Sequence, residues 1–416
     1  MSTAVFSTIG HGLIPTKVVS SQGAGRNSAP DIQEALDSGK GSPVDVYLPD
    51  PLYEVWPAST RAYPGNDSLR INYSNVQLRG NSRFQTTIAC KVTGGLDPNT
   101  HWELPGGVVW RGNGIQIVGA NIANTRIADL RLTGSSPRNL TTYPVWGIGT
   151  PNSAPFPADP ITGEGWDLTN KGINLGVGTT RTNTLIEDCE IDSFRGELFY
   201  YGGSNGNQNL RVRRCIVHDS IASMLSCSGA LIIEDNEFYY GLNAVENTPL
   251  GDAQIIRDNW IHDCPHGISI PSNASPPANG AGRCVIYGNR IVKSYIWAMY
   301  VAGPVRGVWV HDNETSDCPN YGGLLMGGGG PGNTGPQDIT VERNLFRLET
   351  YAGPVVGINA NSDLGYPVTY RIINNRSERS MWAKANGYAI TGLVKVLSEP
   401  SSVCYESGND WSGGEA

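Results

Sequence analysis

The chain has 416 residues, of which 52 are glycine and 27 are proline, and only 16% of its residues are charged. So many turn-forming residues and so few charges exclude a helical bundle or a coiled coil, while 39% apolar residues allow a large core. The net charge of -8 argues against a nucleic-acid partner, because such a partner needs a basic surface.

Two further features bound the class of protein. No apolar run approaches the roughly 20 residues that a membrane span needs, and the N-terminal segment does not have the pattern of a signal peptide. Eight cysteines without metal-site spacing predict buried thiols rather than a zinc site or a disulfide framework.

The first predicted element is a short amphipathic helix over residues 28–39. Ser28 and Asp31 have the spacing of a capping box, Ile32 and Leu36 form an apolar face, and Gly39 ends the helix. Apolar segments typical of strands follow at 44–50, 53–56 and 69–80. We expect residues 1–27 to be an N-terminal extension.

The middle of the chain repeats a pattern of two short apolar segments, the first followed by an asparagine and the second beginning with glycine. Two copies are LIIEDNEFYYGLNAV (231–245) and QIIRDNWIHDCPHGISI (254–270). The period of 21 to 31 residues, with period-2 apolar segments, predicts a solenoid of parallel strands and excludes helical repeats. One column of the repeat contains Cys189, Cys215, Asn236, Asn259, Asn289, Asn313, Asn344 and Asn375.

The asparagine column predicts a structural ladder. Asparagine tolerates the left-handed backbone of a tight corner, and its amide can donate and accept hydrogen bonds along a stack of coils.

Together these features resemble the right-handed parallel β-helix of the pectate-lyase-like superfamily. The resemblance implies an all-β fold, a single right-handed parallel β-helix over 28–397 with a short N-terminal capping helix, followed by a C-terminal tail over 398–416. This fold carries lyases, hydrolases, epimerases and phage tailspikes, so the resemblance is specific for the fold and not for the reaction.

Long insertions follow the strands of the form glycine-apolar-x-apolar, and one more follows the earlier strand TRIADLRLTG (125–134). They lie at 136–170, 271–282, 327–336 and 359–367, and insertions of one phase predict a binding groove on one face of a solenoid. Such a groove suits an extended polysaccharide. The candidate substrate-binding residues are Tyr201, Asn243, Tyr300, Trp146, Trp166 and Arg306.

The resemblance implies an active site on the outer face of one sheet, where Glu197 and Glu246 are the candidate acids. They are two coils apart, or about 10 Å along the stack. Side-chain reach could bring their carboxyls to the separation of about 6.5 to 9.5 Å found in inverting glycosidases.

A second column holds Asp219, Asp263 and Lys293, together with Tyr240 and Asp317. Mixed charges in a stack favour a structural salt-bridge ladder. The alternative is chemical, with Asp219 and Asp263 as acid and base, or Lys293 as the base of a lyase. His266 directly precedes a groove strand and is a further candidate.

We therefore expect a carbohydrate-active enzyme that cleaves a polysaccharide by carboxylate acid-base hydrolysis. The alternatives are a polysaccharide lyase acting by β-elimination on a uronate polymer, a tailspike or adhesin that binds a surface glycan, and a solenoid without a ligand. We expect no cofactor, except calcium if the protein is a lyase. The expected partner is a polysaccharide or oligosaccharide, not nucleic acid or a membrane. We also expect a monomer or homotrimer, extracellular or associated with a virion.

Overall fold

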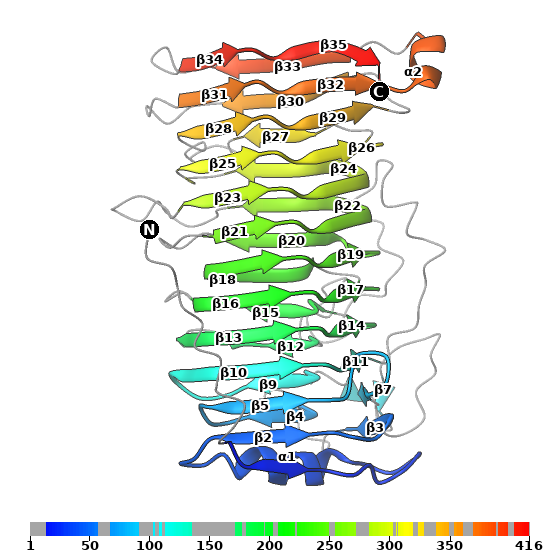
Figure 1. Cartoon of the computed structure of the whole chain (residues 1–416), viewed down its shortest axis with the longest axis vertical. Coiled ribbons are helices and arrows are strands. Elements are labelled where there is room, and N and C mark those ends of the chain that lie inside the picture. Colours follow the sequence, from blue (N-terminus) through cyan, green and yellow to red (C-terminus); the bar gives the residue numbers. More distant parts are fainter. Residues whose placement is uncertain are drawn as a thin grey trace. The chain divides into compact units, whose positions relative to one another are not determined.

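The computed structural model describes most of the chain (Figure 1). The described residues are 14–56, 67–90, 103–104, 108–109, 113–134, 171–176, 180–194, 196–202, 207–220, 223–248, 254–271, 283–302, 305, 307–318, 323–327, 338–348, 353–360, 369–387, 390–397 and 403–415. The chain divides into two units, one with residues 1–142 and 151–227 and the other with residues 143–150 and 228–416. No described helix is long and apolar enough to cross a membrane.

The described part of the first unit has one helix, and its strands pair mainly in parallel. In chain order its elements are β1 (Thr16–Val18), α1 (Ala29–Asp37), β2 (Val44–Tyr47), β3 (Leu52–Val55), β4 (Leu69–Ile71), β5 (Val76–Arg79), β6 (Thr87–Cys90), β7 (Glu103–Leu104), β8 (Val108–Val109), β9 (Ile115–Ile117), β10 (Ile122–Ala128), β11 (Arg131–Thr133), β12 (Ile173–Asn174), β13 (Arg181–Glu187), β14 (Glu190–Asp192), β15 (Phe199–Tyr201), β16 (Asn207–Arg213) and β17 (Ile216–His218).

These strands stack in three parallel series. The first is β1, β2, β5, β10, β13 and β16, and the second is β3, β6, β11, β14 and β17. The third is β4, β9, β12, β15 and the first half of β18 (Ser223–Glu234). Only β7 and β8 pair antiparallel among the described strands.

The second unit repeats the three series. Its elements are the second half of β18, then β19 (Glu237–Tyr239), β20 (Asn243–Thr248), β21 (Gln254–Arg257), β22 (Trp260–Pro271), β23 (Cys284–Tyr287), β24 (Arg290–Ala302), β25 (Val308–His311), β26 (Glu314–Ser316), β27 (Leu324–Gly327), β28 (Ile339–Glu342), β29 (Leu345–Leu348), β30 (Gly353–Ala360), β31 (Thr369–Ile373), β32 (Arg376–Arg379), α2 (Met381–Ala385), β33 (Ile390–Leu397), β34 (Val403–Ser407) and β35 (Asp410–Glu415). The long strands β22 and β24 each contribute to two of the series.

The fold is the predicted right-handed parallel β-helix, with coils stacked in each unit. Helix α1 packs against β2 and β4, as expected of a cap. The predicted capping box is absent, because the Ser28 hydroxyl accepts a bond from the Gln22 N–H and makes no cap bond to the helix. Strands β34 and β35 pair with β31 and β32, so coil strands extend into the segment expected to be a tail.

The core of each unit is apolar and contains most of the thiols. Ile115, Ile173, Phe199 and Leu225 face one another in register in the third series of the first unit, and all are fully buried. Seven of the eight cysteines are buried, which agrees with the prediction of buried thiols.

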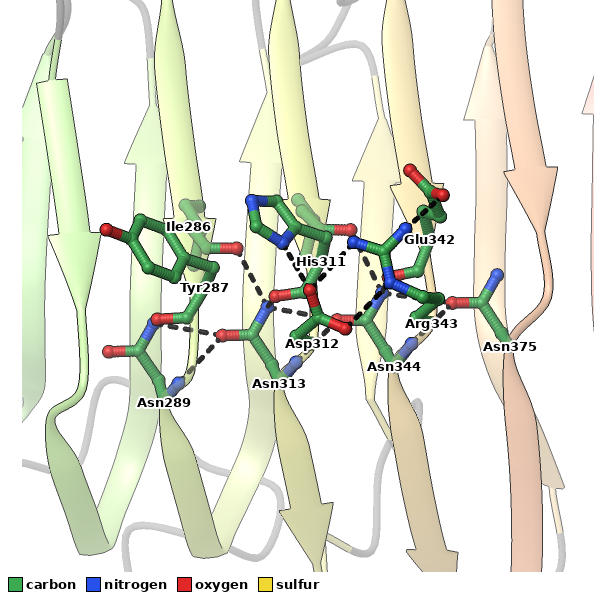
Figure 2. A network of polar contacts seen from close by, with 11 residues as sticks. Ile286, Tyr287, Asn289, His311, Asp312, Asn313, Glu342, Arg343, Asn344 and Asn375 are labelled. Carbon is green, nitrogen blue, oxygen red and sulfur yellow. Dashed lines mark hydrogen bonds and ion pairs between the residues drawn. The ribbon is translucent and has the colours of Figure 1, made fainter.

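The predicted asparagine ladder is present in the second unit and ends at Asn409. Figure 2 shows that Asn289, Asn313, Asn344 and Asn375 lie in one line. Each buried side-chain amide donates to the Oδ1 of the next asparagine, for example at 2.9 Å from Asn289 to Asn313 and 3.0 Å from Asn313 to Asn344. The same Oδ1 atoms accept the backbone N–H of the preceding ladder residue.

The ladder asparagines themselves do not have the expected left-handed backbone. The residue in left-handed backbone is the one before each ladder asparagine, such as Asp258, Asp312 and Arg343 with φ values of 56°, 52° and 53°. The ladder asparagine itself follows the corner. A separate stack of left-handed asparagines occurs in the first unit, linked by bonds of 2.8 to 3.1 Å, and contains Asn75, Asn124, Asn183 and Asn209.

Candidate functional site

The third series of strands presents polar residues in two columns. In the first unit, Gln116, Asn174 and Tyr200 lie in register on neighbouring strands. A parallel column lies three residues earlier along each strand and contains Asn113, Lys171 and Glu197. Its register is fixed by backbone hydrogen bonds, from the Gly114 N–H to the Lys171 carbonyl and from the Gly172 N–H to the Glu197 carbonyl.

Close packing explains the glycine that begins the repeated motif. A Cβ on Gly172 would lie 2.6 Å from the carbonyl oxygen of Leu198 in the next coil. A Cβ on Gly267 would collide with the carbonyl oxygen of Ala298 in the same way. The small residue therefore lets the backbones of adjacent coils pack closely next to the polar columns.

Opposite charges meet in the first unit's columns. Lys171 and Glu197 form an ion pair and are each 7% exposed. The Lys171 ammonium also lies 3.7 Å from the centroid of the Tyr200 ring. The neighbouring Asn113 amide donates to Gln116 at 2.8 Å. This pairing compensates the two buried charges.

The second unit places six side chains in the same two columns, here called the His266 cluster. By register, Asn243, His266 and Trp297 form one column. The second column contains Glu246, Ser269 and Tyr300.

Contacts connect the two columns of the His266 cluster. The Asn243 amide donates to Glu246 at 2.9 Å, and the Asn243 Oδ1 contacts His266 Nδ1. The Trp297 ring stacks on His266 with centroids 4.4 Å apart and lies 4.8 Å from the Tyr300 ring.

These contacts determine the protonation of His266. Because the Asn243 amide nitrogen donates to Glu246, its oxygen faces the ring and accepts a hydrogen bond from the Nδ1–H. Nε2 is buried and has no hydrogen-bond partner among the described residues. Burial lowers the pKa of His266 to about 4, so the ring is neutral at pH 7 and Nε2 carries a lone pair. Burial also raises the pKa of Tyr300, which keeps its proton.

The second predicted column forms the left-handed corners of the coils. Asp219, Asp263 and Lys293 have φ values of 57°, 52° and 55°. Asp219 and Asp263 accept bonds from Nδ1 of the preceding His218 and His262, at 2.8 and 2.9 Å. Aspartate tolerates this backbone conformation well, which supports the structural interpretation of the column. Lys293 has a side chain 51% exposed and lies 3.9 Å from Asp263.

One group in the first unit has the composition of a metal site. Single ligand atoms of Glu190, Asp192 and His218 lie within 4.8 Å of one another. However, Arg131 lies 2.8 Å from Asp192 and 3.2 Å from Glu190. Burial opposes the charge on His218, but bonds to Asp219 and Glu190 outweigh it and raise its pKa to about 9. With the Arg131 guanidinium already beside both carboxylates, these contacts describe an ion-pair network.

The structure does not bring all of the predicted site residues together. His266, Asn243, Glu246 and Tyr300 come together in the second unit, while Glu197 belongs to the first unit. Tyr201 is 1% exposed, so its expected role in substrate binding is wrong. Trp146, Trp166 and Arg306 lie outside the described residues.

Sequence reasoning missed Tyr200, Lys171 and Trp297, together with Asn113 and Gln116, all of which lie in the columns. Tyr200 lies in an outer column, one residue from the buried Tyr201, because side chains alternate along a strand. Lys171 and Trp297 each precede the small residue of the motif, as Glu197 and His266 do. This shared position before the small residue was the sequence signal that could have identified Lys171 and Trp297 as column residues.

Comparisons with known proteins give a likeness in fold. No family model matches the chain, and no curated protein matches its sequence. The A-module of the Azotobacter vinelandii mannuronan C-5 epimerase AlgE4 is 15% identical, with 92% of this chain and 91% of that chain covered and a TM-score of 0.62. The catalytic domain of a GH87 α-1,3-glucanase in complex with nigerose is 14% identical, with 95% and 69% covered and a TM-score of 0.53.

Proposed function

We propose that the protein is an enzyme acting on a uronate-containing polysaccharide, with His266 as the general base. The observation that carries this proposal is the unengaged Nε2 of a neutral, rigidly held His266. Asn243 fixes the tautomer, and the Trp297 ring fixes the plane of the imidazole. Tyr300, whose ring lies beside Trp297, is the proton donor.

The proposed step is the removal of the proton on the carbon next to the uronate carboxylate. His266 Nε2 takes this proton, and the electron pair of the C–H bond forms the C4–C5 double bond. The bond from C4 to the glycosidic oxygen breaks, and the leaving oxygen takes the Tyr300 proton. Return of a proton to the other face of C5, without bond breaking, would instead invert that carbon. Solvent exchange restores both side chains.

The strength of the available acid favours this chemistry over hydrolysis. Tyr300 has a raised pKa, and so weak an acid assists the departure of an alkoxide from a carbanion better than the departure of a sugar through an oxocarbenium ion. The pair Glu197 and Glu246 is less suitable as acid and base. Glu197 is committed to an ion pair with Lys171, whereas a general acid must carry a proton.

The fold likenesses support a polysaccharide substrate. One protein of similar fold is named as a mannuronan epimerase, and its likeness covers more than nine tenths of both chains. Another is an α-1,3-glucanase that binds nigerose. Stacked coils suit an extended polymer because the two columns run along the stack.

A panel of polysaccharides tests the proposal. Wild-type protein is incubated in heavy water with alginate, polygalacturonate, hyaluronan and a neutral α-1,3-glucan, and products are followed by ultraviolet absorbance of unsaturated uronates, reducing ends and deuterium at C5. We expect unsaturated or deuterated product from an acidic polymer. Loss of the base should reduce the rate at least about 100-fold in His266→Ala. The matched histidine variant His311→Ala, remote from the cluster in sequence, should remain active.

Two results would contradict the proposal. One is full activity in His266→Ala, and the other is saturated reducing ends as the sole product. The second result would favour hydrolysis with Glu246, which is a partly exposed carboxylate of the same cluster. Glu246→Gln should then remove activity, whereas under the base mechanism it acts through Asn243 and should reduce the rate less than His266→Ala.

A further inference from the structure

A module of aromatic rings occurs twice in the second unit, away from the His266 cluster. Its first copy is centred on Trp260, whose ring lies 4.5 Å from His262. Tyr239 of the preceding coil also stacks on this imidazole, at 5.0 Å and 9°. Asp263 accepts the Nδ1 bond of His262. The indole is thus held in place while 45% of Trp260 stays exposed.

The second copy has the same construction around Trp309. Its ring lies 4.1 Å from His311, and Tyr287 stacks on His311 at 4.9 Å and 3°. Asp312 accepts the Nδ1 bond at 2.7 Å, and Trp309 is 40% exposed. Both indoles therefore pack against a histidine that is stacked on a tyrosine, and both remain exposed to a similar extent.

The neighbours of the two indoles differ in charge. Trp260 lies in register between Glu237 and Arg290 on the adjacent strands. Trp309 lies between Val285 and Thr340.

Arg290 differs from most arginines around it. It is exposed, and its guanidinium has no ion-pair or hydrogen-bond partner among the described residues. By contrast, Arg257 pairs with Glu234, Arg343 with Asp312, and Arg347 with Glu378. A guanidinium beside an exposed indole is thus left available for an outside anion.

We infer that Trp260 and Arg290 form a second binding site, for a uronate residue of a polysaccharide. The apolar face of the pyranose ring stacks on the indole. The planar guanidinium of Arg290 binds the sugar carboxylate with two parallel hydrogen bonds. Glu237, held 3.2 Å from His262 Nε2, accepts a hydrogen bond from a hydroxyl of the sugar.

This site is distinct from the His266 cluster. Both lie on β22, but the left-handed corner at Asp263 separates Trp260 from His266, so the two residues belong to different strand series. The inference shares the substrate class of the proposed function and adds a place that holds the polymer without reacting with it.

The test measures binding without turnover. Full-length protein carrying His266→Ala is run on native gels containing alginate, polygalacturonate, hyaluronan or dextran, and the dissociation constant is obtained from the retardation. We expect retardation by at least one acidic polymer and none by dextran. Adding Trp260→Ala should weaken binding at least about tenfold, and Arg290→Gln about fivefold. The matched control Trp309→Ala should stay within about twofold.

Three results would overturn the inference. They are equal losses from Trp260→Ala and Trp309→Ala, unchanged affinity in both Trp260→Ala and Arg290→Gln, and absence of retardation by every acidic polymer. Arg290→Gln keeps the indole, so it answers the question even if Trp260→Ala unfolds the protein. The readout does not depend on activity, so failure of the proposed reaction and failure of this site give different results.

Discussion

The asparagine ladder makes a strong prediction for stability at Asn313. This side chain is 1% exposed and sits in the line of amides in Figure 2. Its Nδ2 lies within bonding distance of Asn344 Oδ1, the Ile286 carbonyl and the His311 carbonyl, at 3.0, 2.9 and 3.0 Å. Its Oδ1 accepts from the backbone N–H and the side-chain amide of Asn289, at 3.1 and 2.9 Å. Asn313→Ala removes all of these contacts.

The expected loss of stability in Asn313→Ala follows from the hydrogen bonds that the neighbours of Asn313 lose. The Asn289 side chain keeps bonds to the carbonyls of Ile256 and Tyr287, but its backbone N–H loses its partner inside the protein. An unsatisfied buried donor costs about 1–3 kcal/mol, and each lost bond about 0.5–1.5 kcal/mol net. We therefore expect Asn313→Ala to lower the free energy of unfolding by about 3–5 kcal/mol, measured by urea denaturation.

Asn409→Ala is the matched control at the end of the same ladder. Asn409 also accepts two bonds from the preceding asparagine, at 2.9 and 3.1 Å, but it is partly exposed. Water can replace its lost contacts, so we expect a loss of only about 1 kcal/mol. Equal losses in the two variants, or a loss below about 1 kcal/mol in Asn313→Ala, would refute the argument that buried amide bonding stabilises the stack.

Three further predictions concern single side chains. Because the pKa of His218 is raised from 6.5 to about 9, its stabilising charge is present below pH 6.5, and the free energy of unfolding should decrease as the pH rises through 9, but not in His218→Gln. The pKa of His266 is lowered to about 4, so protonation of the unfolded chain should destabilise the fold as the pH drops from 6.5 to 4, and His266→Gln should remove this dependence in urea titrations. Gly267→Ala should reduce the melting temperature by several degrees, because its Cβ collides with the Ala298 carbonyl, and an unchanged melting temperature would contradict this packing.

Much of the fold could be predicted because a solenoid repeats its local rules. A buried asparagine in the coils of the second unit, alternating apolar residues and a small residue before the third strand recur along the chain. Several copies therefore support the same prediction even where one copy departs from the pattern. The residue in left-handed backbone was misplaced by one position, onto the ladder asparagine. Both asparagine and the aspartate before it tolerate that conformation, so composition alone does not choose between them.

The sequence by itself determined the architecture, the ladder and the strand that carries the polar columns, because these depend on residue types repeated at a regular spacing. Tertiary structure alone decided which partners those polar residues meet. Asn243 and His266 are 23 residues apart, and Lys171 and Glu197 are 26 apart, yet each pair lies on adjacent coils. Coil lengths vary through their loops, so the register that joins a histidine to its amide, or a lysine to its carboxylate, is a property of the stacked backbone.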